Sequence, residues 1–281
     1  MTATRRITLC ADDYGISPGV NRAIADLIAR GRLNATSVMT VGAALERGDV
    51  AALNEAAAQN PNCAIGLHLT LTAPFRPLTM YFRPLDGGTF LPLGVMLRLA
   101  TLRRLDPEIM RAEIAAQLAA FTELFGRAPD YVDGHQHVHL FPQVRDAFLA
   151  AVKDAAPNAW VRQCGRPARK PRRGGAKALL LDILSVEFRR RAARAALATN
   201  TGFAGAYDFS KASDFAALMT GFLAGIPDGG LVMCHPGFVD EMLIALDPFT
   251  HQREREYHYL ASDDFTRLLA AQGVRLSSSS W

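Results

Sequence analysis

The sequence lacks the segments that would carry a chain into or through a membrane. None of its apolar runs reaches the ~18 residues of a membrane span, and the run Ala178 to Val186 is short and interrupted by Asp182. The N-terminus has no 7–15-residue apolar stretch of the kind found in secretory signals. We therefore expect a cytoplasmic protein with no transmembrane segment.

Cysteine is scarce and scattered. The chain of 281 residues has four cysteines, and no two of them form a Cys-x-x-Cys pair. This spacing excludes the common zinc-finger and dithiol motifs and gives no support for a disulfide framework. We expect the cysteines to be reduced residues, at least two of them in buried strands. They are Cys10, Cys63, Cys164 and Cys234.

Nucleotide and nucleic-acid signatures are also missing. The sequence contains neither a Gly-x-Gly-x-x-Gly run after its first strand nor a phosphate-binding Gly-x-x-x-x-Gly-Lys-Ser/Thr loop. The net charge is +4, and the stretch Arg162 to Lys177 holds seven Lys or Arg and no acid. No aromatic residues interleave these charges, so we expect no nucleic-acid partner. A solvated loop explains the stretch, and peripheral contact with anionic lipid is the alternative.

What the sequence does have is a repeated strand-helix alternation. Short apolar runs alternate with helical periodicity, which predicts an α/β fold with a mostly parallel sheet. We interpret it as a distorted (β/α) barrel of about seven mostly parallel strands, formed by one domain over residues 1–281. A long connection, residues 73–106, interrupts the pattern, and connections of that length are usually functional or disordered. Strands are predicted at 6–11, 37–41, up to 68, from 131, at 160–162, at 231–234 and at 274–276.

Acidic residues and histidines follow four of these apolar runs. In a parallel barrel the carboxyl ends of all strands lie on one face, so these residues should converge although they are more than two hundred positions apart. Aspartate with histidine is a composition that binds a divalent metal and moves protons. The four patches are Ala11 to Gly15, Gly66 to Thr70, Asp133 to His139 and Cys234 to Pro236.

Asp12 and Asp13 are adjacent, and neighbours on a regular strand point to opposite faces. They can share a site only if the chain turns there, as Tyr14-Gly15 indicates. Two close carboxylates repel each other, and a metal would relieve this by binding one and leaving the other as a base. Capping of the next helix is the alternative role for one of them, although Ser17 serves better.

The His135-x-His137-x-His139 run allows two interpretations. In an extended chain the three rings would share one face and could form a zinc site by themselves. Because Pro142 starts a helix soon afterwards, only His135 is expected at the strand end, with Asp133. His137 and His139 would then line the mouth of the site. His68 taken alone is a weak signal, since lone histidines in apolar strands are often core residues.

These patches resemble, in order and spacing, the YdjC-like carbohydrate deacetylases, which include chitooligosaccharide deacetylases and a hopanoid-associated branch. The motifs are Ala-Asp-Asp-Tyr-Gly, Gly-Leu-His-Leu-Thr, Asp-Gly-His-Gln-His-Val-His and Met-Cys-His-Pro-Gly-Phe. The resemblance implies metal-dependent removal of acetyl from an N-acetylated sugar or glycolipid. By motif, it makes Asp13, His68 and His135 the metal ligands, Asp12 the general base and His235 the acid. Asp133 would orient a histidine, and Arg162 would hold a carboxylate or a substrate group.

Several alternatives stay open. One Asp with two His suits zinc, manganese, iron or, less naturally, magnesium. A phosphoesterase could use the same residues, whereas a purely structural metal site would need no spare base such as Asp12. The aromatic and aliphatic residues of 73–106 have four alternative roles. They would close over a sugar or contact a lipid carrier, or they would pack on the barrel or be covered by a second copy in a homodimer.

Overall fold

A computed structural model describes residues 4–167, 176–209 and 214–277. Within these ranges eight strands form one sheet, and every strand pairing is parallel. The strand order is β5-β4-β3-β2-β1-β7-β6, and β8 pairs with β1. The strands are β1 Arg5–Tyr14, β2 Ala35–Val38, β3 Ala64–Leu69, β4 Tyr131–Gly134, β5 Trp160–Val161, β6 Phe203–Ala204, β7 Gly230–Cys234 and β8 Val274–Leu276.

The sheet curls into a distorted (β/α) barrel, which confirms the predicted fold class. The edge strands β5 and β6 approach each other without a regular ladder. A single bridge joins Val161 to Thr199, and the Phe203 amide donates to the Gly165 carbonyl at 3.1 Å. Strand β1 lies at the centre, because Ile7 pairs with β7 on one edge and with β8 on the other.

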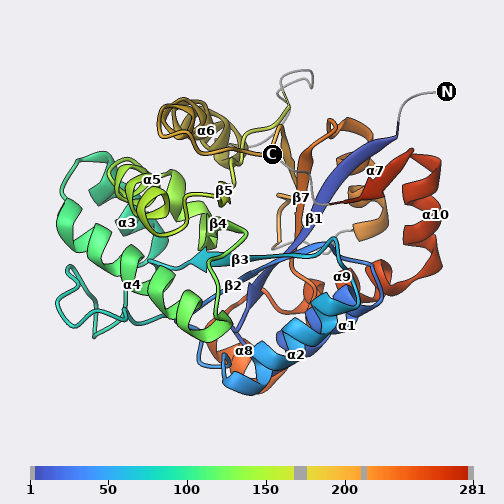
Figure 1. The fold of residues 1–281 in the computed structure, drawn as a ribbon, viewed down its shortest axis with the longest axis horizontal. Coiled ribbons are helices and arrows are strands. Elements are labelled where there is room, and N and C mark those ends of the chain that lie inside the picture. Colours follow the sequence, from blue (N-terminus) through green and yellow to red (C-terminus); the bar gives the residue numbers. More distant parts are fainter. Residues whose placement is uncertain (1–3, 168–175, 210–213, 278–281) are drawn as a thin grey trace.

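Helices surround the sheet (Figure 1): α3, α4 and α5 lie beside its β3–β5 end, whereas α7 and α10 lie at the other end. None of the helices in the described ranges combines the length and apolar character that crossing a bilayer requires. The helices are α1 Pro18–Ala29, α2 Arg47–Ala58, α3 Leu93–Thr101, α4 Pro107–Phe125, the 3₁₀ helix η1 His135–Leu140, α5 Val144–Ala155, α6 Ala176–Arg194, α7 Phe215–Gly225, α8 Glu241–Leu246, α9 His251–Ala261 and α10 Asp263–Ala271.

Helix ends follow local chemistry. The Ser17 hydroxyl accepts a hydrogen bond from the Val20 amide, and Pro18 opens α1 as predicted. Asp106 caps α4 in the same way, and Gly126 ends that helix with a left-handed φ of 67°. These caps fix where α1 begins and where α4 begins and ends.

The connection 73–106 is more ordered than predicted. It contains α3, and Phe75, Phe82 and Phe90 are buried in the core. The carboxylate of Glu113 on α4 accepts hydrogen bonds from the Leu78 and Thr79 amides. The phenylalanines of this segment therefore pack on its own barrel, and its most exposed apolar side chains are Met80 and Tyr81, both 84% exposed.

The basic stretch also differs from its prediction. Arg162 is fully buried in the barrel rather than exposed, and Arg166 forms an ion pair with Asp182 at 2.7 Å. Residues 168–175 lie outside the described ranges. The contact with lipid that was considered for the whole stretch thus has no support from Arg162 or Arg166.

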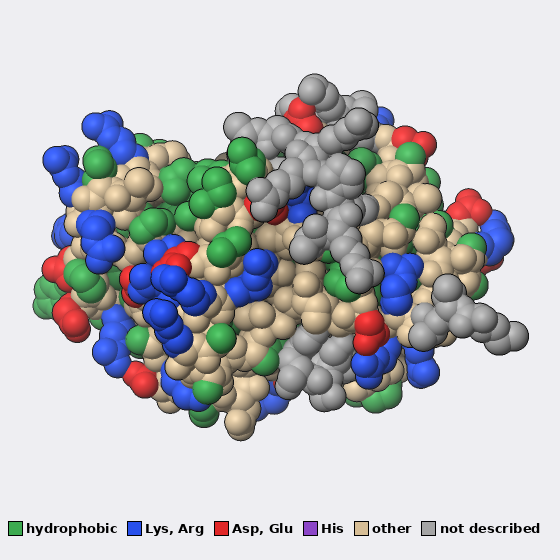
Figure 2. Space-filling model, turned by 90° about the horizontal axis from the view of Figure 1, so that it is seen from above, with side chains coloured by type: hydrophobic (Ala, Val, Ile, Leu, Met, Phe, Trp, Pro, Cys, Tyr) green, Lys and Arg blue, Asp and Glu red, His purple; other side chains and the backbone are tan. Residues whose placement is uncertain are grey.

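Figure 2 shows apolar side chains gathered over α6, where the exposed residues are Leu179, Leu180, Ile183 and Val186.

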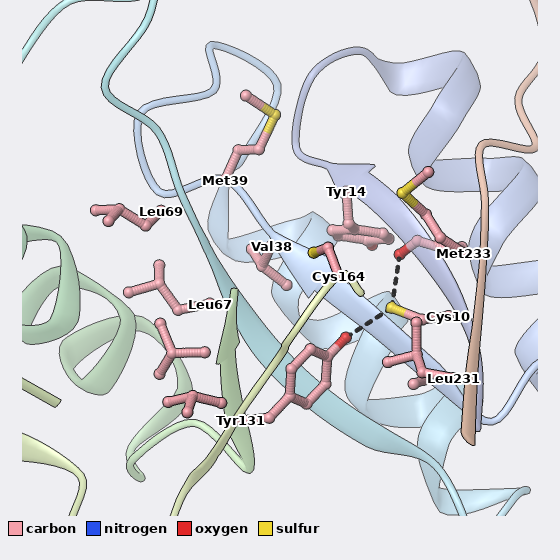
Figure 3. Packing of buried hydrophobic residues seen from close by; sticks show 14 of the residues in the cluster. Cys10, Tyr14, Val38, Met39, Leu67, Leu69, Tyr131, Cys164, Leu231 and Met233 are labelled. Carbon is pink, nitrogen blue, oxygen red and sulfur yellow. Dashed lines mark hydrogen bonds between the residues drawn. The ribbon is translucent and has the colours of Figure 1, made fainter. Parts of the chain in front are cut away.

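The barrel core depends on a glycine in β3. A Cβ on Gly66 would lie 2.5 Å from the ring of Tyr131, so only glycine leaves room for that ring. The Tyr131 ring stacks on Trp160 with centroids 4.3 Å apart. Its hydroxyl lies 2.9 Å from the Cys10 thiol (Figure 3). Of the four cysteines, Cys63 is partly exposed and the other three are buried and free, as predicted.

We predict that Gly66→Ala destabilises the protein by about 1–3 kcal/mol, because the Tyr131 ring must move to admit the methyl group. Urea denaturation followed by circular dichroism measures the change. The control is Gly48→Ala in α2, where an added Cβ meets nothing within 4 Å. Equal stability of the Gly66→Ala variant and the wild type would contradict this packing.

Candidate metal centre

Functional side chains meet at the carboxyl ends of the strands, as the parallel arrangement predicts. Asp12 and Asp13 lie near the end of β1, His68 near the end of β3 and Asp133 in β4. The register places His68 opposite Asp133. Asp13 has a φ of 73°, and the pairing of β1 with β2 shifts between Ala11 and Tyr14. Because of this turn, both aspartates face the same site, which the sequence analysis predicted would need a turn of the chain here.

Asp13, His68 and His135 form the predicted group of three. Their ligand atoms all lie within 4.8 Å of one another, and all three residues are buried. Oδ1 of Asp13 lies 3.0 Å from Nδ1 of His135 and 3.3 Å from Nε2 of His68. Two ligand atoms bound to one zinc at ~2.0–2.1 Å with tetrahedral angles are about 3.3 Å apart. These distances therefore fit a single metal ion.

Asp133 orients His68. Its Oδ1 lies 2.6 Å from Nδ1 of His68, so the other ring nitrogen, Nε2, points to Asp13. This arrangement of carboxylate, histidine and metal site is the common way to fix the ring of a metal ligand. Burial opposes a charge on His68, yet the neighbouring carboxylates of Asp133, Asp12 and Asp13 raise its pKa to about 10.

Arg162 holds the other two carboxylates. Its Nη1 and Nη2 donate to the two oxygens of Asp12 at 2.7 and 2.6 Å, and it also forms an ion pair with Asp133. Burial alone would raise the pKa of Asp12, but the guanidinium holds that pKa well below its usual range. Asp12 is therefore ionised at neutral pH. From the sequence Arg162 was expected to hold a carboxylate or a substrate group, and in the structure it contacts two carboxylates.

A second group of potential ligands lies deeper in the barrel. Ligand atoms of Cys10, Asp12 and Asp133 are also within 4.8 Å of one another. Arg162 already contacts all three, since its Nη2 lies 3.0 Å from the Cys10 sulfur. Burial raises the pKa of the Cys10 thiol well above its usual value, so the thiol stays neutral. The guanidinium thus takes the place of a cation in this second group.

Arg253 and Glu256 are two further residues in contact with the candidate site that the sequence did not reveal. Arg253 on α9 donates from Nη2 to Oδ2 of Asp13 at 2.7 Å. Glu256, one turn later, accepts hydrogen bonds from the His235 amide at 2.5 Å and from the Tyr207 hydroxyl at 2.6 Å. Burial raises the pKa of Glu256 to about 7. The buried face of α9 is polar, so hydrophobic periodicity gives no signal for it.

Charge balance allows a cation at this site. Three buried carboxylates, Asp12, Asp13 and Asp133, are accompanied by two buried guanidiniums, those of Arg162 and Arg253. These five groups sum to one negative charge, which the His68 ring can neutralise by carrying a proton, since its pKa is raised to about 10. A divalent ion at Asp13, His68 and His135 would take the place of that proton.

The remaining histidines separate into distinct environments. His137 is buried with Nδ1 3.5 Å from the Cys164 sulfur. His139 is fully buried, lies 2.8 Å from the Arg162 carbonyl through Nε2, and packs on Phe148 and Phe188. The expectation that His139 lines the mouth of the site is therefore wrong, because η1 turns its ring into the core. Gly134 leaves room for that ring, since a Cβ there would lie 2.8 Å from Nδ1 of His139.

His235 follows β7 and is partly exposed beside an aromatic wall. Its ring packs edge-on against Phe209 and Phe249, with centroids 5.2 and 5.7 Å away. Phe75 contacts His135 in the same way, with centroids 5.6 Å apart. Burial lowers the pKa of His235 to about 4, although Asp13 opposes this shift. Its ring is therefore neutral at pH 7.

Fold and site together define a parallel α/β barrel with a buried Asp-His-His group suited to one divalent ion. The family model of the YdjC-like proteins matches residues 6–271. The chain belongs to the YdjC-like family.

Several solved structures share the fold. An Enterococcus faecalis protein, provisionally described as a cellobiose-phosphate cleavage protein, is 21% identical, with a TM-score of 0.74 over 98% of this chain and 97% of that chain. A lactam utilization protein from Thermus thermophilus is 16% identical, with a TM-score of 0.53 over 98% and 100%. The peptidoglycan N-acetylglucosamine deacetylase Bc1960 is 13% identical, with a TM-score of 0.51 over 96% and 84%. At these identities the likeness shows the fold alone.

Replacing the buried Arg162 should destabilise the protein strongly. In Arg162→Met the carboxylates of Asp12 and Asp133 lose their partner, and we predict a loss of about 3–5 kcal/mol in the free energy of unfolding. The matched control is Arg6→Met, which removes an exposed ion pair with Asp228 and should change the free energy of unfolding far less, because solvent screens exposed charges. Similar losses in both variants would show that the buried network is not the stabilising feature.

Metal content distinguishes the two interpretations of the histidine run. We predict that His68→Ala and His135→Ala each lose bound metal, whereas His137→Ala, whose ring faces Cys164, retains it. Elemental analysis by mass spectrometry after zinc loading and desalting measures the ratio of metal to protein. Full metal content in His68→Ala, or its loss in His137→Ala, would refute the assignment of the three ligands.

Proposed function

We propose that the protein is a metal-dependent hydrolase that removes the acetyl group from an N-acetylated sugar, giving a free amine and acetate. The observation that carries this proposal is the geometry of one site in a YdjC-like chain: a convergent Asp13-His68-His135 group with a spare ionised carboxylate, Asp12, beside it. The fold shared with a peptidoglycan deacetylase agrees with it.

The ligand set fits zinc, manganese or iron well and magnesium less well, because two of its three members are imidazoles. Bound there, a divalent ion would polarise the amide carbonyl and lower the pKa of a water molecule. Only three protein ligands are available in this group, which leaves positions for water and a substrate oxygen.

Asp12 and His235 divide the proton transfers. The Asp12 carboxylate, held by both arms of Arg162, takes a proton from the attacking water. His235 delivers a proton to the departing amine, which is a poor leaving group unless protonated. Because burial lowers the pKa of His235 to about 4, its ring is neutral before the reaction. The proton that it delivers is the one that Asp12 takes from the attacking water, and Asp12 returns to its carboxylate form. The ring of Phe75 and the Phe209-Phe249 wall flank the reacting groups.

Phosphate-ester hydrolysis is the rival activity. The description of the Enterococcus faecalis protein names a phosphorylated disaccharide, cellobiose phosphate, as what that protein cleaves. Phosphate sites usually present arginines to the substrate oxygens. In the described part of the chain, the two buried arginines at this site, Arg162 and Arg253, are already bound to carboxylates. This arrangement favours the amide substrate.

A substrate panel tests the proposal. The metal-loaded protein is incubated with a soluble N-acetylglucosamine oligomer, a glycolipid carrying the same sugar and a sugar phosphate ester, and the products are identified by mass spectrometry. We expect loss of 42 mass units, one acetyl group, from an N-acetylated compound. Release of phosphate with no deacetylation would overturn the proposal.

The same panel separates soluble from lipid-linked substrates. Because the phenylalanines of the 73–106 segment pack on the barrel, its most exposed apolar side chains, Met80 and Tyr81, are the part of it best placed to meet a lipid carrier. If the carrier binds there, a Met80→Ser/Tyr81→Ser variant loses kcat/KM for the glycolipid alone. An unchanged ratio between the two substrates removes the lipid-linked alternative.

Asp12→Asn should retain the metal and lose kcat by ~10²-fold or more, because the amide cannot accept the proton of the attacking water. Steady-state kinetics on the best substrate of the panel measures the loss, and metal analysis confirms that the site is loaded. Near-normal turnover in the loaded variant would exclude Asp12 as the base.

A further inference from the structure

Arg253 is the one arginine in contact with a proposed metal ligand among the described residues. It is fully buried, on the face of α9 that also carries the buried residues Gln252, Glu256 and Leu260. Its Nη2 donates to Oδ2 of Asp13 at 2.7 Å and to Oδ2 of Asp247 at 2.6 Å. Its Nε donates to the Phe249 carbonyl at 2.9 Å. The guanidinium is therefore fixed in position from three directions.

The two oxygens of Asp13 have different neighbours. Oδ1 faces His135 and His68, whereas Oδ2 faces Arg253. A carboxylate can bind a metal through one oxygen or through both. With Oδ2 engaged by a guanidinium, only Oδ1 is directed at the place where the two imidazoles converge.

We propose that Arg253 is a positioning residue that keeps Asp13 a one-oxygen ligand and so preserves an open coordination position for water and substrate. The inference rests on the proposed function only in taking Asp13, His68 and His135 as the metal ligands. Second-sphere partners of this kind orient ligands and tune the metal, and changing them costs about 10–100-fold in metal affinity or activity.

A purely structural role is the competing explanation. Arg253 also connects α9 to the segment that contains Asp247 and Phe249, and its carbonyl accepts from the Gly237 amide at 3.2 Å. If this connection were its whole contribution, losing the side chain would lower stability and leave the coordination of a bound metal unchanged. The two explanations thus differ in the coordination number of the metal.

The test is the visible absorption spectrum of the cobalt-loaded protein, whose intensity falls as the coordination number rises. We expect Arg253→Met to bind one cobalt with a several-fold weaker spectrum, because Asp13 is then free to bind through both oxygens. Arg253→Lys, which can still donate to Oδ2, should keep the wild-type spectrum. The control Asp247→Asn removes the other carboxylate partner of Arg253 and should also keep it.

An Arg253→Met protein that folds by circular dichroism, binds one cobalt and gives the wild-type spectrum overturns the inference. Should that variant fail to fold, a crystal structure of the zinc-loaded wild type decides. We expect Oδ1 of Asp13 on the metal and Oδ2 still on Arg253, and both oxygens at about 2.0–2.2 Å from zinc would overturn the inference. None of these readouts requires activity, so failure of deacetylation alone refutes the proposed function and leaves this inference standing.

Discussion

The structure depends on burying three carboxylates at one end of a barrel. Asp12, Asp13 and Asp133 would repel one another and lose their hydration if they were left alone. Two guanidiniums contact them, that of Arg162 directly after β5 and that of Arg253 on α9. One negative charge remains, and either a proton on His68 or a cation bound where His68 and His135 meet Asp13 can neutralise it.

This constraint gives each aspartate a different task. Asp133 fixes the ring of His68, Asp13 directs one oxygen toward both imidazoles, and Asp12 is held ionised by Arg162. The same chemical group therefore serves as an orienting residue, a candidate ligand and a candidate base according to its hydrogen-bond partner. The metal centre and the proposed proton transfers follow from that division of tasks.

The sequence predicted the site residues that lie at the ends of strands. Asp12, Asp13, His68, His135 and Asp133 follow apolar runs, and parallel strands bring such positions together whatever their separation along the chain. The turn at Asp13 was also predictable, because adjacent strand residues cannot otherwise share a face. The barrel itself followed from the strand-helix alternation.

Other features depend on contacts that no local pattern records. The left-handed φ of 52° and 61° at Gln136 and His137 turns the chain into η1 and sends His139 into the core, against the expectation from an extended run. Arg253 and Glu256 lie on a helix whose buried face is charged, so its periodicity is not hydrophobic. Proline and glycine around α3 obscured a helix that tertiary packing stabilises.

The central claim is that Asp13, His68 and His135 together bind a single divalent ion beside the buried carboxylates. Thermal unfolding of the protein stripped of metal, with zinc added in steps, tests it most directly. The account predicts saturable stabilisation at one ion per chain, about 2.7 kcal/mol when free zinc is 100 times Kd. An unfolding temperature that zinc does not change, or saturation at more than one ion per chain, would contradict it.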